Sequence, residues 1–257
     1  MFRFGDDEQR DRWLPDLVAG RALGAFGLTE PDGGSDAGAT RTRAVPDGDE
    51  WVLNGEKWWI SGAGDPRCKV YIVMTRTSFD EATPKHARHT QFVVPADAPG
   101  IEILRPMEVY GHDDAPHGHM HFRFENVRVP AAAMLLGEGR GFEISQGRLG
   151  PGRIHHCMRA IGAAEKALQL LCERSLSRVA FGKPLARLGG NVDIIANARM
   201  DIEQARLLTL KTAWMMDNVD PKEARVWISM IKTAVPNISI RIVDQAIQMF
   251  GAAGISQ

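Results

Sequence analysis

The segment from residue 27 to residue 39 combines glycines with short polar side chains at the end of an apolar run. Gly33 and Gly34 allow the main chain to approach a bound group closely, because neither residue carries a Cβ atom. Ser35 and Asp36 place small polar side chains beside backbone N–H groups. Such a turn suits the edge of a heteroaromatic ring or a pyrophosphate. The same composition is typical of an ordinary turn, so both interpretations are open at this point.

A second candidate site is the histidine-rich segment from residue 112 to residue 121. In a strand, its alternate histidines would share one face, and a nearby aspartate could complete a metal site. The candidate ligands are His117, His119, His121, Asp113 and Asp114. Gly111 and Pro116 instead make the segment turn-like, and neutral imidazoles on a rim or at an interface can satisfy their hydrogen bonds without a metal. We therefore predict no metal site.

The composition describes a globular chain. Its 257 residues are 44% hydrophobic and 25% charged, which is enough for one or two domains with a core. A net charge of −1 gives no broad attraction for nucleic acid or for an anionic membrane surface. The three cysteines lack metal-type spacing and favour free thiols in a reducing compartment. We see no signal peptide, transit segment or uncharged membrane span, and we expect a cytoplasmic protein of bacterial type.

From about residue 23 to residue 130, short runs of β-branched and aromatic residues alternate with turn signals, which predicts a β domain. The sequence predicts a hairpin whose two strands are residues 50–53 and 56–61, joined by Asn54-Gly55. Trp58 and Trp59 should then point to opposite sides of their strand. Further strands are predicted at residues 69–75, 91–95, 101–106 and 119–124, with a polar surface loop at 78–90.

Helical periodicity begins near Gly141 and continues to about Phe250. It predicts three long helices, the second at residues 192–216 and the third starting after Asp220, and Pro236 predicts a kink in the third. A short amphipathic helix is predicted between residues 3 and 19.

The predicted fold class is α+β, with a central antiparallel β domain followed by a C-terminal α-helical bundle. We place the domain limits at residues 1–22, the end of an N-terminal helical domain, at 23–135, the β domain, and at 136–257, the bundle.

Three motifs, in order, resemble the signatures of the acyl-CoA dehydrogenase family. They are the turn at 27–39, the Arg-Val-Ala-Phe-Gly-Lys-Pro run at 178–184 and the Gln-Met-Phe-Gly-Ala-Ala-Gly run at 248–254. The Gly-Pro-Gly-Arg-Ile-His-His run at 150–156 is similar to the subgroup whose animal members join such a dehydrogenase to a phosphotransferase-like domain. The resemblance implies that most of a preceding helical domain is missing from this chain.

The resemblance also implies an FAD-dependent α,β-dehydrogenation of acyl-CoA thioesters, as in fatty acid β-oxidation. The implied cofactor-binding residues are Phe26, Leu28, Thr29, Ser35, Trp59, Ile60, Ser61, Arg178, Phe181, Gln248 and Gly251. Ser35 and Arg153 are the implied CoA-binding residues. The last four cofactor residues would reach a flavin bound by a neighbouring subunit, so the resemblance implies a homodimer or homotetramer. The implied electron acceptor is an electron-transfer flavoprotein or a similar protein.

The sequence also departs from the family pattern. Ala252 replaces a glycine of the last motif, and Asn191 is the counterpart that the resemblance implies for the polar residue that follows Phe-Gly-Lys-Pro. The chain stops at Gln257, before the segment that usually carries the base, and Gly152 occupies the other known base position. We therefore assign no catalytic base and expect little turnover from these 257 residues.

Two other functions fit the same residues. One is a flavin oxidase or monooxygenase of the same fold, which flavin reduction followed by exposure to oxygen would identify. The other is a non-catalytic module that binds CoA or forms oligomers, and flavin retained on purification would count against it. A eukaryotic source with a missing N-terminus would instead imply a mitochondrial or peroxisomal protein.

Overall fold

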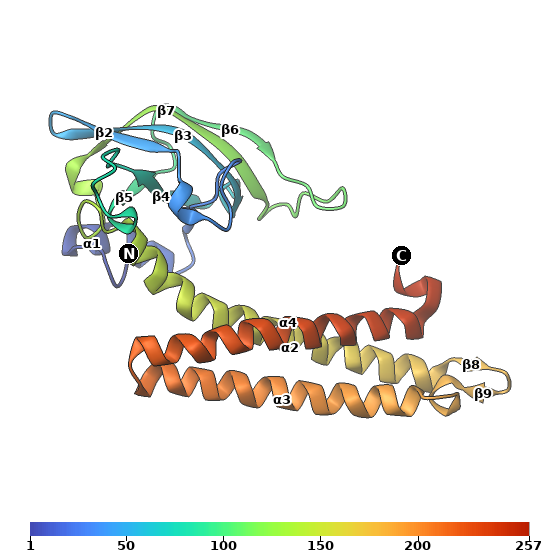
Figure 1. Cartoon of the computed structure of the whole chain (residues 1–257). Coiled ribbons are helices and arrows are strands. Elements are labelled where there is room, and N and C mark those ends of the chain that lie inside the picture. The colour runs from blue at the N-terminus through green and yellow to red at the C-terminus, as the bar shows by residue number, and fades with distance from the viewer. Residues whose placement is uncertain (257) are drawn as a thin grey trace. The chain divides into compact units, whose positions relative to one another are not determined.

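The computed structural model describes residues 1–256, without the side chains of Pro221 and Lys222. Gln257, the end of the predicted bundle, lies outside the described residues. The chain divides into two compact units, Met1–Gln146 and Gly147–Gln257 (Figure 1). The predicted domain limits at residues 22 and 135 stay predictions.

A seven-stranded sheet forms the first unit. Its strands are β1 (Leu23–Gly27), β2 (Arg43–Asp47), β3 (Glu50–Ser61), β4 (Cys68–Arg76), β5 (His89–Pro95), β6 (Ile101–Pro106) and β7 (His119–Pro130). The order is β1-β4-β2-β3-β7-β6, and β5 pairs with β4. Most pairs are antiparallel as predicted, but β1 and β2 each run parallel to β4. The predicted later strands are confirmed, and β7 continues six residues past its predicted end at residue 124 to Pro130.

Alternate residues of these strands fill the main core, whereas Val70 of β4 and Val93 of β5 belong to a second buried cluster. Leu53, Phe92, Phe122, Phe124 and Val127 are all at most 1% exposed. The ring centroids of Phe122 and Phe124 lie 5.1 Å apart, edge to face. Because side chains alternate along β3 and β7, the residues between these core positions lie on the opposite face of the two strands, which we call the outer face.

The predicted Asn54-Gly55 hairpin is wrong, because both residues lie inside the continuous strand β3. The chain reverses instead at Gly48, between β2 and β3, where φ is +62°. Gly55 has a φ of +147° and marks a register shift against β7. The Asn54-Gly55 pair thus forms an irregularity within a strand. At this point the Asn54 side-chain oxygen accepts a hydrogen bond from the Asn126 N–H.

We expect Gly55→Ala to destabilise the first unit by about 1–3 kcal/mol, the usual cost of overpacking. A Cβ atom at residue 55 would lie 2.6 Å from the Thr42 Cα atom, which belongs to the backbone and cannot move aside. Gly48→Ala is the matched control, because a Cβ atom there would meet nothing within 4 Å. Urea unfolding followed by circular dichroism measures both changes. Equal losses in the two variants would show that the close approach at Gly55 is unimportant.

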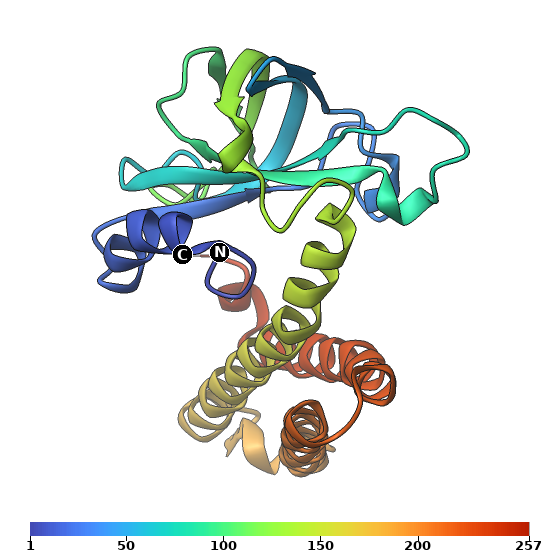
Figure 2. The ribbon, with the colours of Figure 1, turned by 90° about the vertical axis from the view of Figure 1, so that its left-hand side faces the viewer.

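Helix α1 (Asp7–Val18) confirms the predicted N-terminal helix and packs on the sheet (Figure 2). A reciprocal capping box between Asp6 and Gln9 begins it. The Gln9 amide also donates to the carbonyls of Ala132 and Met134, 2.8 and 3.1 Å away. Trp13 and Leu17 of α1 pack against a buried apolar cluster. Those contacts fix the element that immediately precedes β1.

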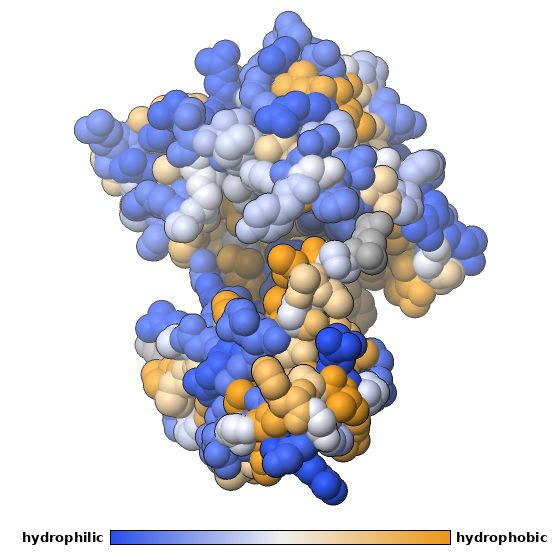
Figure 3. All heavy atoms as spheres, turned by 90° about the vertical axis from the view of Figure 1, so that its right-hand side faces the viewer, coloured by the Kyte–Doolittle hydropathy of each residue, from blue (hydrophilic) through white to orange (hydrophobic). Residues whose placement is uncertain are grey.

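The three predicted helices are α2 (Gly141–Ser177), α3 (Asn191–Asn218) and α4 (Pro221–Phe250). The second unit holds α3, α4 and the part of α2 from Gly147 onward. Their buried faces meet in one cluster that includes Leu171, Ile202, Ile231 and Ile242. Other apolar side chains of this unit are exposed (Figure 3). Leu207, for example, is 65% exposed. Pro236 lies inside α4, and the predicted kink there stays a prediction.

Within the described residues, one segment, Glu223–Gly254, is long and apolar enough to cross a membrane by length and composition alone, with a mean hydropathy of 1.2. A single helix of this kind is weak evidence for a membrane span, because core helices of globular proteins meet the same criterion.

Candidate functional site

The turn after β1 is fixed to β3 by a buried lysine. Lys57 Nζ donates to the Leu28 carbonyl oxygen at 3.1 Å and to Glu30 Oε1 at 2.7 Å. The Trp58 N–H donates to the Thr29 carbonyl oxygen at 3.0 Å. Three consecutive residues of the turn, 28 to 30, are therefore tied to two consecutive residues of the strand.

Glu30 is the centre of this network. Its carboxylate also accepts the N–H groups of Arg41 and Thr42, at 2.6 and 2.9 Å. Burial raises the pKa of Glu30. The Lys57 charge and these hydrogen bonds together lower the pKa by more than burial raises it, so the pKa of Glu30 lies below its usual value. Burial lowers the pKa of Lys57 to about 8, against the opposing effect of Glu30. Both groups are charged at neutral pH, and the pair holds the turn in place.

Beyond Glu30, the turn presents free backbone donors to solvent. Among residues 1–256, the N–H groups of Gly34 and Ser35 have no hydrogen-bond acceptor. A Cβ atom at Gly34 would meet nothing within 4 Å, so the space in front of this turn is open. Successive unpaired N–H groups in an open turn form an anion-binding concavity. The geometry therefore fits the pyrophosphate interpretation of the sequence.

A β-bulge in β3 shapes the outer face beside this turn. The register against β7 shifts between Lys57 and Ile60, and Trp59 has a φ of +57°. Trp58 lies 6.1 Å from the ring of His121, and Trp59 lies 6.1 Å from the ring of His119. These two histidines occupy alternate positions of β7 and so share one face. The prediction that the two tryptophans point to opposite sides is therefore wrong, because the bulge sets two residues against one.

The histidines of β7 make hydrogen bonds with side chains of β3. Ser61 pairs directly with His119 in the sheet, and Ser61 Oγ lies 2.8 Å from His119 Nδ1. His121 Nε2 lies 3.0 Å from Glu56 Oε2. No three potential ligands in the described part of the chain are grouped to hold a metal ion. His119 and His121 of this segment lie on the outer face of the sheet, and residues 112–118 form the loop before β7.

The structure brings the first group of predicted cofactor residues together around the end of β1 and the bulge of β3. Phe26, Leu28 and Thr29 are half-buried, and Ser35 and Ser61 are exposed. Trp59 is 37% exposed, whereas Ile60 is 2% exposed and belongs to the core. Ile60 could therefore meet a ligand only through its backbone.

The second group lies at one end of the helical unit. Phe181 and Gly182 form the turn between the short strands β8 (Val179–Ala180) and β9 (Lys183–Pro184), both with positive φ. The Phe181 side chain is 94% exposed. Gln248 and Gly251 lie where α4 ends, and the Arg174 guanidinium lies 5.3 Å from the Phe250 ring, so α2 and α4 end side by side. Arg178 is exposed at the end of α2, and Arg153 is half-buried within it.

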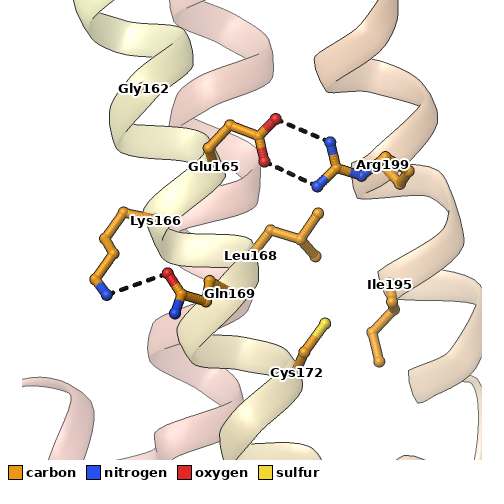
Figure 4. Close-up of a pocket in the computed structure, with 8 residues that line it drawn as sticks. All are labelled: Gly162, Glu165, Lys166, Leu168, Gln169, Cys172, Ile195 and Arg199. Carbon is orange, nitrogen blue, oxygen red and sulfur yellow. Dashed lines mark hydrogen bonds and ion pairs between the residues drawn. The ribbon is translucent and has the colours of Figure 1, made fainter.

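A hollow between α2 and α3 is a different candidate site (Figure 4). Arg199 donates two hydrogen bonds to Glu165, at 2.9 and 2.8 Å, and Arg206 also contacts this carboxylate. The Arg199 hydrogen bonds lower the pKa of Glu165 most, burial opposes them, and Arg206 adds to the lowering, which brings the pKa to about 2. A carboxylate with so low a pKa is a weak base, so Glu165 serves the packing of the two helices.

Glu165→Gln should destabilise the helical unit by about 1 kcal/mol or less at pH 7, as is usual for partly exposed ion pairs. Because the folded-state pKa lies below the unfolded value, the contribution is complete above about pH 4.5 and is lost as the pH falls toward 2. The stability difference between parent and variant should shrink over that window. Urea unfolding at several pH values measures it, with the exposed Glu173→Gln as control. A difference that stays constant with pH would contradict the assignment.

The Glu30–Lys57 pair and the Ser61–His119 contact were not predicted from the sequence. The alternation of β3 held a signal for the first, because Lys57 falls on the inward series of Trp51 and Leu53. A lysine at an inward position requires a buried partner. The second contact depends on the strand pairing, which the sequence did not specify.

Comparison with known proteins agrees with this fold. Residues 25–127 match the sequence model of the acyl-CoA dehydrogenase middle domain, and residues 139–257 match that of the acyl-CoA dehydrogenase C-terminal domain. The chain is 50% identical over 257 residues to the probable acyl-CoA dehydrogenase FadE2 of Mycobacterium tuberculosis, covering all of this chain and 62% of that protein. The chain belongs to the acyl-CoA dehydrogenase family.

Two solved structures extend this comparison. A putative acyl-CoA dehydrogenase from Mycobacterium abscessus superposes with a TM-score of 0.94 at 49% identity, over 99% of this chain and 62% of that one. A glutaryl-CoA dehydrogenase from Mycobacterium smegmatis in complex with FADH2 has a TM-score of 0.84 at 31% identity, over 99% and 62% of the two chains. The chain spans between 24% and 62% of the length of the curated relatives it matches.

Proposed function

We propose that this chain forms the FAD- and acyl-CoA-binding core of an enzyme that dehydrogenates acyl-CoA thioesters between the α and β carbons. The supporting observation is the open turn at Gly34 and Ser35 beside the outward-facing Trp59 and Ser61. The turn offers N–H donors for phosphate, and the bulge offers an aromatic surface and a hydroxyl for a planar ring. A related structure that holds FADH2 supports the choice of flavin.

Each residue of this core has a role that its chemistry permits. The N–H groups of Gly34 and Ser35 would bind a pyrophosphate, while Phe26, Leu28 and Thr29 would lie along the ring edge. The Trp59 indole would cover one face of the ring, and Ile60 would contribute its backbone alone. Bound FAD supplies the acceptor for the hydride that leaves the β carbon. The protein residues hold the ring in place and exclude water from it.

Removal of the α proton requires a carboxylate within hydrogen-bond reach of the substrate. Glu30 cannot serve, because it is buried and bound to Lys57, Arg41 and Thr42. We name no base and expect binding without rapid turnover. Arg153 is the candidate for contacts with CoA phosphates, for which a guanidinium is well suited. An electron-transfer flavoprotein or similar acceptor would reoxidise the flavin, and the compartment would be the cytoplasm in a bacterium.

The experiment that tests this function adds saturated acyl-CoAs of different lengths to the FAD-loaded chain without oxygen. Binding should change the flavin absorption bands in a saturable way, because the thioester would lie against the ring. Arg153→Ala should weaken that response, and Arg187→Ala, an arginine outside the predicted site, should not. A flavin spectrum that does not respond to any acyl-CoA would contradict the proposal.

Flavin occupancy should also rise with self-association, because Arg178, Phe181, Gln248 and Gly251 are proposed to contact a flavin held by another copy. The Phe181 ring is 94% exposed at the tip of the β8–β9 turn, which leaves it accessible to another copy. Binding and association would then be linked. Sedimentation with and without FAD measures the link, with Phe181→Ser as the variant. A monomer that carries full flavin would contradict the shared site.

A further inference from the structure

Ser61 and His119 form a pair on the outer face of the first unit. They are directly opposite each other in the β3–β7 ladder, with 2.8 Å between Ser61 Oγ and His119 Nδ1. The Ser61 side chain is exposed, and the His119 ring lies 6.1 Å from the Trp59 ring. The pair therefore lies on the surface that we propose for the flavin ring.

The second nitrogen of His119 faces an acid. His119 Nε2 lies 3.6 Å from Asp114 Oδ2, and Asp114 is held at a φ of +58° beside the strand. An anion at this position favours the imidazole tautomer with its proton on Nε2. Nδ1 is then a lone-pair acceptor, and the Ser61 hydroxyl donates to it.

A hydroxyl beside a flavin has two possible arrangements. The reacting nitrogen of an oxidised isoalloxazine accepts a hydrogen bond, whereas the same nitrogen carries a hydrogen after hydride uptake and must donate one. The hydroxyl proton must therefore point toward the oxidised ring and away from the reduced ring. In a site from which water is excluded, the second arrangement requires another acceptor for that proton.

We propose that His119 is a positioning residue whose Nδ1 atom accepts a hydrogen bond from the Ser61 hydroxyl and so favours the reduced form of the bound flavin. This inference rests on the proposed function, because it places Ser61 against the ring. In the reduced form, Ser61 Oγ accepts a hydrogen bond from the ring N–H, and the Ser61 hydroxyl donates a hydrogen bond to Nδ1, so every donor has an acceptor. In the oxidised form, the Ser61 proton turns to the ring, and the lone pairs of Oγ and Nδ1 face each other.

Removal of the imidazole should therefore lower the flavin midpoint potential. In the reduced form of His119→Leu, the Ser61 O–H group has no acceptor. An unsatisfied donor costs more free energy than an unused lone pair. Loss of one such hydrogen bond changes the ratio of the dissociation constants for oxidised and reduced FAD by about tenfold, or about 30 mV for a two-electron couple. His119→Gln should recover most of the shift, because its amide oxygen can accept the same proton.

The test measures the midpoint potential of the FAD-loaded chain for the parent, His119→Leu, His119→Gln, Ser61→Ala and the double variant. Because His119 acts through Ser61, the leucine substitution should cause no further shift in the Ser61→Ala background. His112→Ala, at an exposed histidine of the same segment, is the control and should keep the parental potential. Circular dichroism confirms that each variant is folded.

The outcomes separate this inference from the proposed function. An unchanged potential in His119→Leu, or a shift that persists without the Ser61 hydroxyl, would overturn the role of His119 and leave the flavin site standing. No FAD binding by the parent chain would overturn the proposed function, and this inference with it. A lower potential in His119→Leu that glutamine restores would establish the assignment.

Discussion

Replacing Lys57 with methionine should lower the free energy of unfolding of the first unit by about 3–5 kcal/mol, the usual cost of removing one partner of a buried ion pair. The side chains of Lys57 and Glu30 are 0% and 5% exposed, and they lie 2.7 Å apart. Methionine fills nearly the same volume but leaves the Glu30 carboxylate without its counter-charge. The Leu28 carbonyl loses its hydrogen bond as well. Urea unfolding followed by circular dichroism measures the change.

The interaction itself is measured by the double variant Lys57→Met/Glu30→Gln. Neutralising both groups removes the unpaired buried charge, so the double variant should be more stable than the sum of the single changes implies. Lys69→Met is the matched control, because Lys69 is exposed and its Nζ atom donates to the Pro66 carbonyl oxygen. Strict additivity, or an equal loss in the control, would show that the pair does not stabilise the turn.

Trp59→Ala should raise the dissociation constant for FAD by about 10- to 100-fold. Stacking of a heteroaromatic ring on an aromatic side chain is worth about 1–3 kcal/mol, and 1.4 kcal/mol is a factor of ten. Trp59 is 37% exposed and contributes little to the buried core, so the variant should stay folded. Fluorescence titration with FAD measures the constant directly.

Two further variants separate ligand binding from backbone strain. Trp59→Gly also removes the ring, but glycine accepts the φ of +57° without strain and should be the more stable variant. Both should lose affinity for FAD to the same extent. Phe79→Ala, at a 53% exposed aromatic of the same unit, should not change the affinity. Parental affinity in both Trp59 variants would show that the ring does not contact the flavin.

Local sequence signals predicted the elements more reliably than their connections. The strand at residues 101–106 and the helix after Asp220 were correct, because alternation and capping act within a few residues. Asn54-Gly55 misled the hairpin prediction because Asp47-Gly48, seven residues earlier, is a turn signal too, and only the pairing of β2 with β3 selects Gly48. The prediction that Trp58 and Trp59 point to opposite sides was wrong because the bulge is set by the neighbouring strand.

The residues of the candidate site could be predicted from the sequence, but the contacts that hold them in place could not. The turn at Gly33 and Gly34 carries its own signal, since only residues near in sequence are needed to form it. Glu30 and Lys57 are 27 residues apart, and Ser61 and His119 are 58 apart, so their contacts follow from the sheet order. A polar residue at an inward strand position predicts that a buried hydrogen-bonding or charged partner exists, but it does not show which residue that partner is.

The most direct test of the flavin site is an equilibrium titration of the parent chain with FAD, followed by flavin absorption and fluorescence. The site described here predicts saturable binding of one FAD per chain, weakened by Trp59→Ala and by Lys57→Met in folded protein. Binding that both variants share with the parent would place the flavin elsewhere. Flavin that remains free at every protein concentration, in a chain that is folded and able to associate, would contradict the central claim.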